Sequence, residues 1–138
     1  MKRTFTLLLT FVYIMACNTV KNDPSSQSLN RVWMLVEFNQ YSKEFLTKKA
    51  AYLDLTQAES SSSKMGCNQL SFPVSIKNES QITFSGGIAT KMYCEDMKLE
   101  TDFSKAITSM TNYSIENHKL TLTSDNGVKM IFVDQEWD

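Results

Sequence analysis

Residues 64–77 read KMGCNQLSFPVSIK, and the second half of this stretch decides the class of fold. Apolar side chains recur there at every second position, at Leu70, Phe72, Val74 and Ile76. Because successive side chains of a strand point to opposite faces, this alternation predicts a β-strand over residues 69–77 with one apolar face. Pro73 has no N–H to donate to a neighbouring strand, so we expect this strand to lie at a sheet edge or to bulge at the proline.

The residues before this stretch predict two more strands. Residues 30–38, NRVWMLVEF, are rich in β-branched and aromatic side chains, and residues 51–55, AYLDL, alternate between two faces. A turn is expected at residues 39–42. Residues 59–63, ESSSS, hold no apolar side chain, so we interpret them as a polar loop.

The residues after this stretch predict one helix among further strands. Residues 97–110, MKLETDFSKAITSM, carry apolar side chains at spacings of three and four, which is typical of an amphipathic helix. Asp96 is the expected N-cap, and Glu100 falls on the polar side of the helix. Asn126-Gly127 favours a two-residue hairpin turn. Short strands are expected at residues 81–84, 113–115, 120–123 and 128–133. The predicted fold class is therefore mainly antiparallel β with one α-helix (α+β).

The beginning of the chain has the features of an export signal. Basic residues precede an apolar run, FTLLLTFVYIMA at residues 5–16, that is too short to span a membrane as a helix. We therefore interpret residues 1–16 as a signal peptide. Residues 14–17, IMAC, resemble the bacterial lipobox, in which the sulfur of the cysteine, here Cys17, receives a lipid. The alternatives are a cysteine close to an ordinary cleavage site and a cysteine in an uncleaved buried helix.

Residues 18–29, NTVKNDPSSQSL, are too polar to form a core. We expect residues 17–29 to be a lipidated cysteine with a flexible tether and residues 30–138 to form one domain. The protein would then be exported and anchored to a bacterial membrane, facing the periplasm or the cell surface. Without the signal peptide, 12 of the 14 Lys and Arg residues remain against 15 Asp and Glu, a formal charge of −3. This acidity argues against binding to nucleic acid.

Two cysteines, Cys67 and Cys94, remain for the domain. In an oxidising compartment such a pair is most simply a disulfide, and two buried thiols side by side are the other structural interpretation. A catalytic thiol would need a base, and the single histidine, His118, lies in an expected turn. A tetrahedral zinc site would need four ligands, and these three residues supply at most three. The pattern favours the structural interpretations over redox catalysis and metal binding.

Other side chains that could carry chemistry also have structural interpretations. Glu95 and Asp96 precede the expected helix, where negative charge complements the positive end of the helix dipole. The aromatic side chains stand at strand and helix spacings, which is more typical of a core than of a ligand cavity. Gly86-Gly87 is followed by neither the lysine nor the helix of a phosphate-binding loop. We therefore predict no catalytic residue, no metal ligand and no cofactor.

The order of these features resembles the META domain, a family that includes the HslJ-type heat-inducible envelope proteins. The resemblance rests mainly on Gly66-Cys67-Asn68 and on Thr90-Lys91-Met92-Tyr93-Cys94. Weaker matches are Trp33-Met34-Leu35, Leu99-Glu100, Phe103, Tyr113, Ile115, Leu120, Leu122 and Gly127. The resemblance implies a compact, β-barrel-like or curved-sheet domain with a helix, found in bacterial lipoproteins, and a family for which no catalytic residues are established.

Together these expectations describe a lipid-anchored bacterial envelope protein that is not an enzyme and has a structural or protein-interaction role in envelope or stress physiology. Its expected partners are the membrane, through the lipid on Cys17, and an unidentified envelope protein. The alternative is a small-ligand-binding barrel or a minor envelope enzyme. That alternative predicts a cavity between the helix and the sheet, lined by aromatic side chains and a few convergent polar groups.

Overall fold

The computed structural model describes residues 29–136. In chain order the elements of this part are β1 (Val32–Phe38), α2 (Lys43–Lys48), β2 (Tyr52–Asp54), the 3₁₀ helix η1 (Ala58–Ser60), β3 (Ser61–Lys64), β4 (Gln69–Phe72), β5 (Val74–Ile76), β6 (Ile82–Phe84), β7 (Ile88–Ala89), α3 (Lys98–Ile107), β8 (Met110–Glu116), β9 (Lys119–Ser124) and β10 (Lys129–Asp134).

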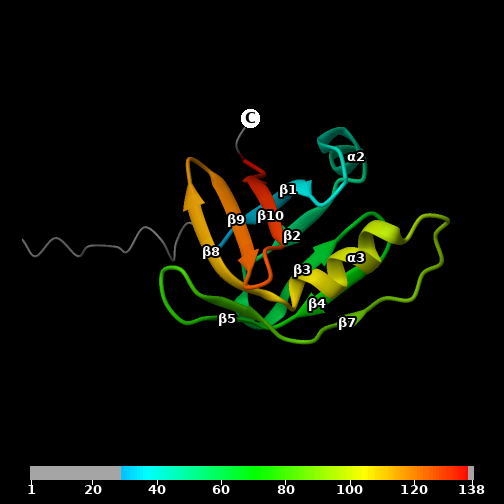
Figure 1. Cartoon of the computed structure of the whole chain (residues 1–138). Coiled ribbons are helices and arrows are strands. Elements are labelled where there is room, and N and C mark those ends of the chain that lie inside the picture. The colour runs from blue at the N-terminus through cyan, green and yellow to red at the C-terminus, as the bar shows by residue number, and fades with distance from the viewer. Residues whose placement is uncertain (1–28, 137–138) are drawn as a thin grey trace, which may run out of the picture.

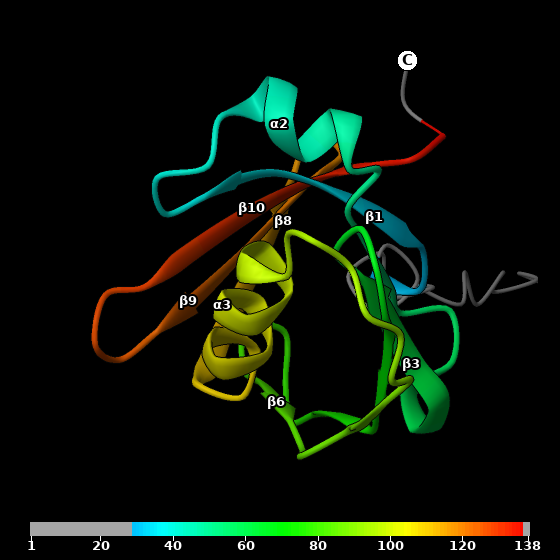
Figure 2. The same cartoon turned by 90° about the vertical axis from the view of Figure 1, so that its right-hand side faces the viewer.

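Eight of these strands form one sheet in the order β7-β4-β3-β2-β1-β10-β9-β8, and β5 and β6 pair in a separate ribbon (Figure 1). Every pairing is antiparallel. The sheet is strongly curved, and α3 lies within the curve, with β9 and β10 on one side and β3 on the other (Figure 2). The predicted class, mainly antiparallel β with one principal helix, is confirmed.

The core lies between the concave face of the sheet and α3. Trp33 and Leu35 of β1 are buried, and a bulge between Leu35 and Glu37 turns Phe38 inward as well. The Trp33 indole N–H donates to the carbonyl oxygen of Leu29 at 2.9 Å. Leu29 is itself buried, so the packed core includes the last residue of the expected tether. The helix contributes Leu99, Phe103 and Ile107.

The serine-rich segment at residues 59–63 is not a loop, and this prediction was wrong. Its last three residues begin β3, which pairs with β2 on one side and with β4 on the other. Ser61, Ser62 and Ser63 are all buried. A strand with partners on both sides satisfies its backbone polar groups, and the Ser61 hydroxyl donates a hydrogen bond to Gln57 O at 2.9 Å. Neither effect leaves an apolar pattern in the sequence.

Residues 69–77 form two strands and not one. β4 belongs to the large sheet, whereas β5 pairs with β6, and Pro73 lies between them. The Pro73 carbonyl still accepts a hydrogen bond from Ser85 N–H at 3.1 Å, but the proline has no N–H with which to continue the ladder. The chain therefore changes sheets at the proline. Along the predicted apolar face, Phe72 is buried and Ile76 is exposed.

The predicted helix is confirmed as α3, with a different cap. The N-cap residue is Met97 and not Asp96. The Asp96 carboxylate nevertheless accepts a 3.3 Å hydrogen bond from the N–H of Lys98, the first residue of the helix. The sequence pattern did not reveal α2, which has six residues and buries only Leu46. Such a short helix presents too few turns for a periodic signal. No helix among residues 29–136 has the length and apolar character needed to cross a membrane.

The two C-terminal hairpins are present with their turns where the sequence predicted them, but the two-residue turn lies in the first hairpin and not in the second. The two-residue turn is Asn117-His118, where both residues have positive φ, at 48° and 61°. The β9–β10 connection, in which Asn126-Gly127 was predicted to be such a turn, is longer, because the last strand pair is Thr123 with Lys129. Ser124 N–H and Val128 carbonyl hydrogen-bond within that loop at 3.0 Å.

Candidate functional site

Residues 86–96, which we call the strap, connect the β5–β6 ribbon to α3. The strap contains β7, runs beside β4 and projects past the N-terminal end of α3 (Figure 1). Apart from Cys94, which is half-buried, every residue of the strap is exposed. An exposed segment of this length with only two residues in a strand would ordinarily be mobile. The strap is instead attached to the domain at several points.

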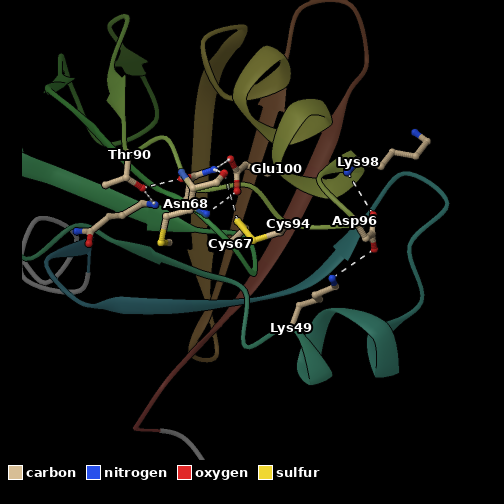
Figure 3. Close-up of a disulfide and its surroundings, with 10 residues drawn as sticks. Lys49, Cys67, Asn68, Thr90, Cys94, Asp96, Lys98 and Glu100 are labelled. Atoms are coloured by element: carbon tan, nitrogen blue, oxygen red, sulfur yellow. Dashed lines mark hydrogen bonds and ion pairs between the residues drawn. A yellow bond between two sulfur atoms is a disulfide. The ribbon is translucent and has the colours of Figure 1, made fainter.

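A disulfide joins Cys67 and Cys94, with 6.3 Å between their Cα atoms (Figure 3). Cys67 lies just before β4 and is 4% exposed. Cys94 lies near the end of the strap. The bond therefore ties the return of the strap toward α3 to the start of the strand beside which the strap runs.

Asn68, next to the disulfide, forms a second and polar attachment (Figure 3). Its side-chain oxygen accepts from Thr90 Oγ1 at 2.8 Å and from Met92 N–H at 2.7 Å. Its Nδ2 donates to Met92 O at 3.1 Å and to Glu100 Oε1 at 2.9 Å. Its backbone N–H donates to Glu100 Oε2 at 2.7 Å. The side chain thus uses both donors and both lone pairs of its amide, and it holds the strap and α3 together.

Two glycines, Gly66 and Gly87, lie where the backbone passes close to neighbouring segments. Gly66 has φ of 115°, and a Cβ there would lie 2.8 Å from Lys49 Cδ. A Cβ on Gly87 would lie 2.4 Å from the backbone oxygen of Ser71 in β4. Another residue at position 87 would push β7 away from β4, so glycine is required for the strap to pair with the sheet.

Ion pairs surround the first turn of α3. Asp96 lies 3.3 Å from Lys49 Nζ, and the hydrogen bond from Lys98 N–H, followed by that from Lys49, holds the pKa of Asp96 below its usual value. Asp102 accepts from Lys98 Nζ at 2.6 Å and from Tyr41 Oη at 2.7 Å, and these two hydrogen bonds lower its pKa. Burial, and then the Asp102 carboxylate, raise the pKa of Tyr41. These contacts fix the helix end into which the strap leads.

The strap exposes three large apolar side chains. Ile88 is 80% exposed, Tyr93 is 91% exposed and Met92 is 53% exposed. β7 is also the last strand of the sheet, so one of its two backbone edges has no strand beside it among residues 29–136. An open sheet edge is where an extended polypeptide can add as a further strand.

A small hollow lies on the inner side, between α3 and strands β3, β4 and β7. Its volume is about 90 Å³, and its polar lining includes Ser63, Glu100 and Ser104. Phe103 is the aromatic contribution, and Leu70 and Ala89 also line it. This is the location predicted for a ligand cavity, although the lining has fewer aromatic side chains than that prediction required.

Comparison with known proteins identifies the family. The family model of the META domain matches residues 27–137. The chain belongs to the META domain family. A solved structure, described as the NMR structure of the protein from Burkholderia xenovorans, has the same fold with a TM-score of 0.66 and 18% sequence identity, and the match covers 98% of each chain. No curated protein matches the chain.

The remaining candidates for chemistry in this META domain lie in a separate cluster. Buried Asp134 pairs with Arg31, accepts Glu136 N–H at 3.1 Å and lies 3.7 Å from His118 Nδ1. Burial alone would raise the pKa of Asp134, but these hydrogen bonds and the Arg31 charge more than offset it, so the pKa lies below its ordinary value. The cluster therefore contains an ionised carboxylate whose cationic partner is Arg31, and it joins the residue before β1, the end of β10 and the β8–β9 turn.

The sequence placed several of these residues correctly and missed others. The disulfide joins the two cysteines for which this pairing was predicted, whereas His118 lies in the Asp134 cluster. Cys17 and the expected signal peptide lie outside the described residues. Within residues 29–136, no group of three or more His, Cys, Asp and Glu side chains is placed to hold a metal ion.

Glu100 was the main omission. We assigned it to the polar side of the helix, yet it is half-buried and binds Asn68 through both carboxylate oxygens. It is the immediate neighbour of Leu99 and stands three residues before Phe103, at the flank of the apolar face. A carboxylate at such a flank is a signal that the helix pattern contained, but its partner lies 32 residues away in the sequence.

Proposed function

We propose that this META domain is an exported, lipid-anchored binding module that acts through its strap and is not an enzyme. The partner is an envelope protein that adds an extended segment to the open edge of β7. The observation that carries this proposal is the combination of a free strand edge with exposed Ile88, Met92 and Tyr93 on a backbone held by a disulfide and by Asn68.

Rigidity supports this function. A flexible strap would lose conformational entropy on binding, and that loss would weaken the complex. The Cys67–Cys94 bond and the Asn68 hydrogen bonds impose this order before any partner arrives. In strand addition the backbone supplies affinity and alternate side chains supply specificity. Ile88 and Tyr93 are then the side chains that a partner would recognise.

The lipid anchor supports a partner at the membrane. In the expected mature chain, the 11 residues 18–28 separate Cys17 from Leu29, the first residue of the domain core. A fully extended chain spans at most about 3.3–3.6 Å per residue, so the tether would hold the domain within about 40 Å of the bilayer. Replacing Cys17 with Ser should release the protein from membranes in fractionated cells. Continued membrane association of this variant would contradict the anchor.

The strap itself is tested by photo-crosslinking in the cells that make the protein. A benzophenone amino acid at position 88 or 93 should capture one partner that mass spectrometry identifies, with a crosslink inside a short segment of that partner. The same amino acid at Lys119, which is exposed in the β8–β9 hairpin, is the control. Equal capture at all three positions, or capture at position 119 alone, would contradict the proposal.

Strap side chains should matter for binding and not for folding. Ile88→Ser and Tyr93→Ser should each change the free energy of unfolding by less than about 0.5 kcal/mol, because both side chains are largely exposed. The double variant should nevertheless lose the crosslinked complex formed through a probe at position 92. Urea denaturation measures the first effect. A large loss of stability would mean that the strap side chains pack against the domain and do not await a partner.

A further inference from the structure

The hollow beneath α3 is a second feature that could bind a ligand, and it is lined mainly by residues outside the strap. It lies between the helix and the β3-β4-β7 end of the sheet, on the inner side of β7. Its volume of about 90 Å³ is well below the roughly 300–1,000 Å³ of pockets that hold drug-sized ligands. The space suits a few water molecules or one small organic group. Size alone therefore excludes nucleotides, sugars and most cofactors.

Ser63 is the unusual residue of this hollow. It is 1% exposed, and its hydroxyl has no hydrogen-bond partner among residues 29–136. Ser61, two residues earlier on the same face of β3, donates to Gln57 O at 2.9 Å. Buried hydroxyls in proteins are normally satisfied, so an unpartnered one that lines a hollow indicates a ligand or water that completes it.

Apart from the hydroxyl of the exposed Thr101, the other polar groups of the hollow are mainly acceptors. Glu100 carries negative charge, and each of its oxygens accepts one bond from Asn68 and keeps a further lone pair. The Ser104 hydroxyl donates its hydrogen to Thr101 O at 3.0 Å, so only its lone pairs remain. Asn68 has no unused donor. A ligand that complements this set must itself donate hydrogen bonds and carry positive charge.

The apolar part of the lining sets the rest of the ligand. Met65, Leu70 and Phe103 contribute hydrocarbon or aromatic surface to the same hollow. A cation without hydrocarbon would leave this surface uncovered, and a long chain would not fit the volume. We propose that the hollow binds a primary ammonium group on a short aliphatic chain, either a free amine or a lysine side chain. This proposal does not rest on partner binding at the strap, since Ala89 is the strap residue that lines the hollow and neither Ile88 nor Tyr93 does.

The test uses the isotopically labelled protein, without its signal peptide, and n-butylammonium as the probe. Amide chemical shifts of Ser63, Ala89 and Ser104 should change in a saturable manner. Binding should be at least about tenfold weaker for 1-butanol, which lacks the charge that pairs with Glu100, and butanoate should not bind. Amide shifts on the β8–β9 hairpin should stay unchanged.

Two serine variants separate the hydroxyl from the fold. Ser63→Ala should weaken butylammonium binding about fivefold, the typical effect of one lost hydrogen bond, without lowering the melting temperature. Ser62→Ala is the matched control, because Ser62 is buried on the same strand and faces the other side of it. That variant should bind butylammonium as the natural protein does.

The source of the ammonium group is distinguished by a second titration. An extended peptide with one central lysine should bind at least tenfold more tightly than butylammonium if the natural ligand is a protein side chain, and no more tightly if it is a free amine. Absence of saturable shifts with both probes, or equal weakening by Ser62→Ala and Ser63→Ala, would overturn the proposal and leave the hollow as a site for water only. Crosslinking at the strap would be unaffected by that result.

Discussion

At one end of the eight-stranded sheet, β8 is covered, and at the other end β7 is open. Tyr113 N–H of β8 donates to Ser80 O at 2.8 Å, and Gln81 forms an isolated bridge with Asn112, so the β5–β6 ribbon covers this edge. β7 pairs with β4 through two residues and has no strand on its other side within the described residues. The two edges show two ways to stop a sheet from growing.

The covered edge needs no special bond, because backbone hydrogen bonds occupy it. The open edge is short, and a disulfide and a polar network hold its chain in place. Natural proteins often protect edges by keeping them very short or by covering them. The β7 edge combines shortness with exposed apolar side chains, and the proposed binding of a partner rests on this combination. The following variants compare the two edges, beginning with the largest expected effect on stability.

Loss of the disulfide should have the largest effect. The bond joins residues separated by 27 positions, and loop-closure entropy for such a length corresponds to about 3–4 kcal/mol. Cys67→Ser combined with Cys94→Ser should lower the free energy of unfolding by that amount in urea denaturation. Hydrogen exchange should speed up at strap amides and stay slow at Tyr113. A loss below about 1 kcal/mol would mean that the Asn68 network alone orders the open edge.

Removal of the Asn68 side chain should have the next largest effect. Asn68→Ala deletes hydrogen bonds to Thr90, Met92 and Glu100 and leaves the partly buried Glu100 carboxylate with fewer donors. We expect a loss of about 2–3 kcal/mol and faster exchange of the Met92 amide. Asn112→Ala at the covered edge is the control, and its loss should stay below about 1 kcal/mol. Equal losses in the two variants would contradict the importance of the network.

Acid titration tests the middle of the sheet, between the two edges. The pKa of Asp134 lies below its ordinary value of 3.8, so the ionised carboxylate stabilises the folded state above that pH. This contribution should disappear as the pH falls below about 4 and through the folded-state pKa. Asp134→Asn should lower stability by about 2 kcal/mol at pH 7 and by much less at pH 2. Melting curves between pH 2 and 7 measure the difference, and a pH-independent loss would refute the assignment.

The smallest of these effects belongs to the covered edge. The Tyr113 hydroxyl donates to Asn78 O at 3.2 Å, which adds one side-chain bond to the backbone contacts of β8 with the ribbon. Tyr113→Phe should cost about 1 kcal/mol. The Ser80–Tyr113 backbone bond should survive, as judged by slow exchange of the Tyr113 amide. Rapid exchange in this variant would show that the side chain, and not the backbone, holds the ribbon on the sheet.

The predictability of the two edges differs for a physical reason. Strands β8, β9 and β10 follow one another through short hairpins, and each carries the alternation that predicted it. The open edge depends on contacts between distant residues, such as Asn68 with Glu100, and no local period records them. The serines of β3 represent the extreme case, because a buried strand without apolar side chains has the same composition as a loop.

Local periodicity in the sequence was sufficient to predict the antiparallel class and the late amphipathic helix, and the cysteine count together with the expected export signal predicted the pairing of Cys67 with Cys94. Periodicity reflects which side of an element meets the core, so it can be recognised without knowing which segments pack against that element. Tertiary structure alone decided that Pro73 divides one apolar run between two sheets, that Ser63 lies buried beside a hollow and that the strap is the open end of the sheet. Those features depend on which distant segments lie side by side, and that information appears only when the chain has folded.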